Sequence, residues 1–128
     1  MFIRFVIAGL DADSGRRQGL FQASAALIDS GRMNPLDQER LEQIYRWFKQ
    51  HLPVPARFAV SQRPHAKAQA LSWFRDSATE HIDRIREYQN ILEIYGLQVE
   101  MLRTKRPGYI VYQDEYQVAA YPFSDTPC

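Results

Sequence analysis

The sequence predicts an α+β domain: a mostly antiparallel sheet with about three helices packed on one face. Three observations favour this class. An apolar, strand-like run occupies residues 2–8, helical periodicities fill the middle of the chain, and three short strand-like runs follow one another near its end. The chain has 128 residues and no internal repeat, low-complexity tract or linker. We therefore expect residues 1–128 to form a single domain with its own core.

The first predicted strand, residues 2–8, carries apolar side chains on both faces. Such a strand is typical of the interior of a sheet, where both faces are covered. Arg4 is the exception, and we interpret it as a side chain whose charged end reaches solvent. The alternative is a cation directed at a ligand. Residues 9–19 are polar and glycine-rich, which predicts a flexible connection.

Two helices are predicted next, over residues 20–30 and from Pro35 to about residue 52. Gly31 suits the end of the first helix, whereas Asn34 and Pro35 suit the start of the second. Apolar residues at three- and four-residue spacing give the second helix one buried stripe: Leu41, Ile44, Tyr45, Phe48 and Leu52.

The longest predicted element is a third helix over residues 67–95, preceded by a short strand at 56–60. Its apolar stripe follows helical spacing: Leu71, Phe74, Ala78, Ile82, Ile85, Leu92 and Tyr95. Because adjacent helical residues diverge by about 100°, we expect Phe48 and Phe74 to face the core. Trp47 and Trp73 should then lie toward its edge.

The end of the chain predicts a three-stranded meander over residues 97–101, 109–112 and 116–121. Pro107 and Gly108 separate the first two strands, because proline presets its φ and glycine accepts the positive φ of a type II turn. We expect the N-terminal strand to lie between members of this meander.

The bulk composition narrows the function. Sixteen basic and fifteen acidic side chains leave a formal charge of +1, which argues against a dedicated nucleic-acid binder. The only cysteine is Cys128, so no intramolecular disulfide forms, and we expect a cytoplasmic location. No apolar run approaches the ~18 residues of a membrane span, so no membrane partner is expected.

The connection after the first strand is the first candidate site. It contains Asp11, Asp13, Arg16 and Arg17 and leads into a helix. Free N–H groups at a helix start attract anions, and the two arginines reinforce this attraction. The spacing matches neither a P-loop nor a dinucleotide fingerprint, and an ordinary surface loop is the alternative. Two aspartates alone do not make a calcium loop, so we expect no metal.

A second basic group, Arg103, Lys105 and Arg106, adjoins several tyrosines. Cations interleaved with aromatic rings can hold a nucleotide or a single strand. The alternative is structural, because tyrosine is a favoured strand residue and lysine near a strand end discourages aggregation. Arg103 and Arg106 join the tentative anion-binding set.

No arrangement typical of catalysis is recognisable. The three histidines show no zinc-ligand spacing, and no serine has the glycine flanks of a nucleophile elbow. The catalytic residues are therefore left unassigned, and no cofactor is expected.

The leading hypothesis is a small non-catalytic binding or interaction module with an anion-accepting loop or an aromatic-rimmed surface. Its partner would be a small anionic ligand or a protein, with a homodimer as one form of assembly. The alternative is a hydrolase or transferase acting on a phosphorylated or nucleotide-like substrate. In that case Asp11 or Asp13 would supply the base or a metal ligand, and Arg16, Arg17 and Arg103 would stabilise the developing phosphate charge. This mechanism requires the two basic groups to converge.

Overall fold

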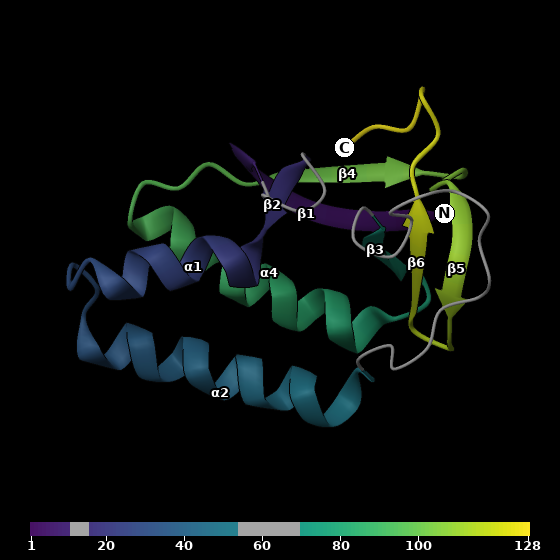
Figure 1. The fold of residues 1–128 in the computed structure, drawn as a ribbon. Coiled ribbons are helices and arrows are strands. Elements are labelled where there is room, and N and C mark those ends of the chain that lie inside the picture. Colours follow the sequence, from purple (N-terminus) through teal and green to yellow (C-terminus); the bar gives the residue numbers. More distant parts are fainter. Residues whose placement is uncertain (11–15, 54–69) are drawn as a thin grey trace.

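The structure is a computed structural model that describes residues 1–10, 16–53 and 70–128. Helices cover one face of a six-stranded antiparallel sheet (Figure 1), which confirms the predicted α+β class. The elements in chain order are β1 (Phe2–Leu10), β2 (Arg17–Gly19), α1 (Leu20–Asp29), α2 (Pro35–His51), β3 (Leu71–Arg75), α4 (Thr79–Ile94), β4 (Glu100–Thr104), β5 (Tyr109–Gln113) and β6 (Gln117–Tyr121).

Strand β1 is the centre of the sheet. On one edge it pairs with β4, from Phe2 opposite Thr104 to Val6 opposite Glu100. On the other edge it pairs first with β3 and then with β2. Beyond β3 the order continues to β6 and β5. β1 is therefore an interior strand, as the apolar character of both its faces predicts.

The three C-terminal strands follow one another closely along the chain, but their pairing separates them. β5 and β6 form a hairpin, whereas β4 pairs with β1. In Figure 1, β1 and β4 run across the view while β5 and β6 stand nearly upright. The sheet therefore turns strongly between its two ends, with β3 as the connection between β1 and β6.

The prediction of one helix over residues 67–95 is wrong in its first part. Residues 71–75 form β3, and the helix begins at Thr79. In β3, Leu71 and Trp73 are buried on the same face and pair with β6. A short aromatic run fits either a strand or one turn of a helix, and the distant pairing with β6 decides the outcome here. The proposed strand at 56–60 lies outside the described residues.

The first C-terminal strand begins later than predicted, at Glu100 rather than at residue 97. Gly96, with a φ of +88°, ends α4 and redirects the chain. Leu97 and Val99 then pack against the helix-side core before the chain reaches its pairing position beside Val6. Residues 17–19 also differ from the prediction. They were expected to belong to a flexible connection, but they form β2, which pairs with β1.

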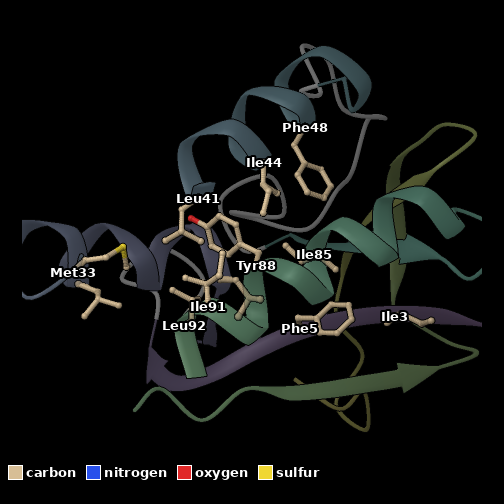
Figure 2. Close-up of a cluster of buried hydrophobic side chains, with 12 residues drawn as sticks. Ile3, Phe5, Met33, Leu41, Ile44, Phe48, Ile85, Tyr88, Ile91 and Leu92 are labelled. Atoms are coloured by element: carbon tan, nitrogen blue, oxygen red, sulfur yellow. The ribbon is translucent and has the colours of Figure 1, made fainter. Parts of the chain in front are cut away.

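The sheet buries apolar side chains on both faces. The larger cluster lies between the sheet and the helices, and Figure 2 shows Phe5 of β1 facing residues of α2 and α4. The smaller cluster lies on the opposite face. It contains Val6, Leu71, Trp73, Leu102 and Val118, with Phe2 and Cys128 packed against it. Trp73 is 1% exposed, so the expectation that it lies at the edge of the helical core is wrong.

Candidate functional site

The first predicted basic group lies where β2 meets α1. Arg17 is part of β2, and its guanidinium group forms an ion pair with Glu100 of β4 at 2.5 Å. Arg16 precedes it and is exposed. Asp11 and Asp13 lie outside the described residues. Arg17 is therefore engaged in joining two strands on opposite edges of β1.

The second basic group lies at the other end of the sheet. Arg103 is opposite Ile3 of β1, whereas Arg17 is opposite Leu10. The Arg17 guanidinium group contacts Glu100, which lies three residues before Arg103 in β4. Side chains three residues apart in a strand project from opposite faces of the sheet. Arg106 forms an ion pair with Asp125 at 3.6 Å, and its guanidinium group lies 4.9 Å from the centre of the Phe123 ring. The structure does not bring the two predicted basic groups together.

Arg4 lies in a hollow at the start of α1. One guanidinium nitrogen of Arg4 donates to the backbone oxygen of Arg17 at 2.8 Å, and another donates to that of Ser72 at 3.4 Å. The hollow has a volume of about 400 Å³ and includes the first residues of α1. The N-cap residue of α1, Gly19, supplies no side-chain hydrogen bond to the helix. Arg4 therefore ties β1 to β2 and β3 beside these helix N–H groups.

A second hollow of about 400 Å³ lies between α1 and α2, and Tyr88 of α4 contributes to its lining. We call it the Phe21 pocket. It is lined by Phe21, Gln22, Ser24, Ala25, Ile28, Leu41, Glu42, Tyr45 and Tyr88. The Phe21 ring makes edge-to-face contacts with Tyr45 and Tyr88, at centroid distances of 5.2 and 5.0 Å. Such contacts fix the ring orientations in addition to burying apolar area.

Two hydroxyl groups meet at this pocket. The hydroxyl oxygens of Ser24 and Tyr88 lie 2.5 Å apart, and the Ser24 hydroxyl donates to the backbone oxygen of Phe21 at 2.8 Å. Figure 2 shows Tyr88 within the helix-side core, with its hydroxyl group beside Leu41. Burial raises the pKa of Tyr88 above its ordinary value, with the Ser24 contact opposing this effect. Tyr88 therefore remains a neutral phenol at physiological pH.

The Phe21 pocket was not predicted from the sequence. A signal for it exists in α1, where four small residues, 23–26, stand between Phe21 and Leu27. Small side chains on one helix leave space against a neighbour. The depth of that space depends on how α1, α2 and α4 pack against one another. The pocket therefore cannot be predicted from the small residues of α1 alone.

A second aromatic cluster surrounds His81, whose side chain is buried at the junction of α4 and α2. A ring nitrogen of His81 lies 2.8 Å from the backbone oxygen of His51, and the ring stacks on Tyr116. Trp47 stacks on His51, and the Arg84 guanidinium group lies over its ring at 4.3 Å. The His81 ring thus provides a hydrogen-bond partner for the backbone oxygen of His51, the last residue of α2. The partial burial of Trp47 against the helix-side core confirms that it lies at the edge of the core.

Comparison of the chain with known protein families, with curated proteins and with solved structures found no match in any of the three. Within residues 1–10, 16–53 and 70–128, no three His, Cys, Asp or Glu side chains are grouped so that they could hold a metal ion. In the same part of the chain, no helix has both the length and the apolar character needed to cross a membrane.

Proposed function

We propose that this protein is a non-catalytic binding module and that the Phe21 pocket is its ligand site. The observation that carries the proposal is the composition of the pocket: three aromatic rings around about 400 Å³, with two hydroxyl groups held by a shared hydrogen bond. Small-molecule sites are typically concave, mostly apolar and supplied with a few fixed polar groups. The Phe21 pocket has each of these properties.

The enzyme alternative, a hydrolase or transferase acting on a phosphorylated substrate, is not favoured. It requires Arg17 and Arg103 to stabilise one developing charge, and charge stabilisation needs donors within about 3 Å of the reacting oxygen. The Arg17 guanidinium group contacts Glu100, whereas Arg103 lies three residues further along β4, where side chains project from the other face of the sheet. This arrangement supports a binding module over that mechanism.

The proposal can be tested by recording ¹⁵N–¹H correlation spectra of the full chain with a library of small aromatic and aliphatic molecules. Binding at the Phe21 pocket should shift the backbone signals of Gln22, Ala25 and Tyr45. If no compound in the library shifts these signals, the Phe21 pocket is not a ligand site and the proposal fails.

Two neighbouring residues of α1 provide a matched pair of variants. Ala25 and Ala26 are both exposed, but only Ala25 lines the pocket. Ala25→Phe should fill the mouth of the pocket and weaken every hit. Ala26→Phe adds the same ring outside the pocket and should leave the affinities unchanged.

The expectation of an anion at the start of α1 remains a prediction, and the same spectra test it. Inorganic phosphate should shift the backbone signals of Gly19 and Leu20, beside Arg4, if that hollow accepts anions. Homodimerisation and a cytoplasmic location also remain predictions. Light scattering coupled to size-exclusion chromatography measures the first, and imaging of the tagged protein in its cell tests the second.

A further inference from the structure

The hydroxyl pair in the Phe21 pocket has a fixed hydrogen-bond direction. A backbone oxygen only accepts, so the 2.8 Å contact between Ser24 and Phe21 uses the single hydroxyl proton of Ser24. The proton in the 2.5 Å contact between the two hydroxyls must therefore come from Tyr88. The hydroxyl protons of Ser24 and Tyr88 are then both used in hydrogen bonds, and only lone pairs remain free on the two oxygens. The pair can accept a hydrogen bond from a ligand but has no proton to donate.

The charged side chain that lines the pocket is also a hydrogen-bond acceptor. Among the described residues that line it, Glu42 is the only charged one. A carboxylate also accepts hydrogen bonds and donates none. Gln22 at the rim has both donor and acceptor groups, so it favours neither kind of ligand.

The aromatic wall is also suited to a cation. The Lys49 ammonium group lies 5.0 Å from the centre of the Tyr45 ring, which is a cation–π arrangement within the protein itself. Tyr45 is 41% exposed. The part of the ring that Lys49 does not cover is thus open to the apolar body of a ligand, and a ligand cation would replace Lys49 over the ring.

From these three observations we infer that the Phe21 pocket binds a small apolar amine in its ammonium form. Its N–H groups donate to the lone pairs of Tyr88 and Ser24 or to the Glu42 carboxylate, and its apolar body packs against Phe21 and Tyr45. This inference rests on the proposed function, because it specifies the ligand class of the same pocket.

The test compares three probes of similar size that differ in one polar group: 2-phenylethylamine, 2-phenylethanol and phenylacetate. Each is titrated into the full chain at neutral pH, and its dissociation constant is measured from the shifts of the Ala25 and Tyr45 backbone signals. We expect the amine to bind most tightly. Glu42→Gln should weaken amine binding about two- to fivefold, as the loss of an exposed ion pair does. Glu39→Gln, which removes an exposed charge from the same helix outside the pocket, should have no effect.

The outcomes separate the inference from the proposed function. Equal or tighter binding of 2-phenylethanol or phenylacetate at the same signals would overturn the inference and leave the proposed function standing. Equal amine affinity in Glu42→Gln and Glu39→Gln would also overturn it. If none of the three probes shifts the pocket signals, the inference fails, and the library screen then decides separately whether the proposed function fails with it.

Discussion

The hydroxyl groups of Ser24 and Tyr88 lie 2.5 Å apart and join α1 to α4 inside the helix-side core. The two residues are 64 positions apart in the chain. Their contact orients the Tyr88 ring, which in turn meets Phe21 edge to face. Through this contact the packing of the core and the shape of the Phe21 pocket depend on each other.

The two sides of this hydrogen bond should differ in their effect on stability. Tyr88→Phe removes the donor, and Ser24 keeps its bond to the Phe21 backbone, so we expect a loss of about 1 kcal/mol. Ser24→Ala leaves the buried Tyr88 hydroxyl without its acceptor, so we expect a larger loss of about 1–3 kcal/mol. Urea unfolding of both variants measures the difference. A Tyr88→Phe variant less stable than Ser24→Ala would contradict the assigned direction of the bond.

The ion pair between Arg40 of α2 and Glu87 of α4 should make stability depend on acid pH. Hydrogen bonding to Arg40 lowers the pKa of the Glu87 carboxyl from its ordinary value, against the opposing effect of burial. A lowered folded pKa means that the contribution is fully present above the unfolded pKa of about 4.3 and is lost as the pH falls through the folded value.

Arg40→Gln is therefore expected to reduce the free energy of unfolding at pH 7, with the deficit fading below about pH 4. The loss should not exceed about 1 kcal/mol, because the two side chains are 41% and 42% exposed. Urea unfolding from pH 7 to pH 3 measures it, with Arg32→Gln as the control that removes an exposed charge. A deficit that stays constant across this range would rule out the ion pair as its source.

Gly108 should tolerate no side chain. Its φ is +133°, and a Cβ atom there would lie 1.9 Å from the backbone oxygen of Tyr121. Gly108→Ala must therefore displace the β5–β6 hairpin, and we expect a loss of about 3 kcal/mol or more. Gly31 also has positive φ, but a Cβ atom there has open space, so Gly31→Ala should cost only about 1–2 kcal/mol. Equal melting temperatures for the two variants would contradict the close approach.

The two tryptophans should report different environments. Trp73 is buried on the far face of the sheet, whereas Trp47 is only partly buried beside the helices. In Trp47→Phe the remaining fluorescence comes from Trp73 and should be poorly quenched by acrylamide. The wild-type protein should be quenched more strongly, because Trp47 contributes. Similar quenching of the two proteins would show that Trp73 is accessible.

Elements whose signals are local could be predicted from the sequence. Asn34 and Pro35 start α2 as expected, and the Asn34 side chain accepts a hydrogen bond from the Leu36 backbone N–H. The positive φ of Gly108 was also expected from its place after Pro107. Both features depend only on residues a few positions apart in the chain, so a sequence pattern is enough to predict them.

Features that depend on distant partners could not be predicted in the same way. β3 is a strand because it pairs with β6, with Leu71 opposite Ala120. Its own residues, read alone, continue the helical spacing of α4. The Phe21 pocket likewise requires Ser24 and Tyr88 to meet. The basic groups were identified by residue type, but the placement of Arg17 relative to Arg103 follows from strand pairing and from the contact between Arg17 and Glu100.

The central place of β1 has a consequence for how this chain folds during synthesis. The half of β1 that begins at Phe2 pairs with residues near Arg75 on one edge and near Thr104 on the other. Translation proceeds at about 5–20 residues per second, so β4, the second partner of these residues, is synthesised roughly 5–20 s after them. During that interval at least one edge of this apolar strand is unpaired, and such segments are prone to aggregate. The topology thus leaves this apolar segment without its second partner until β4 has been synthesised.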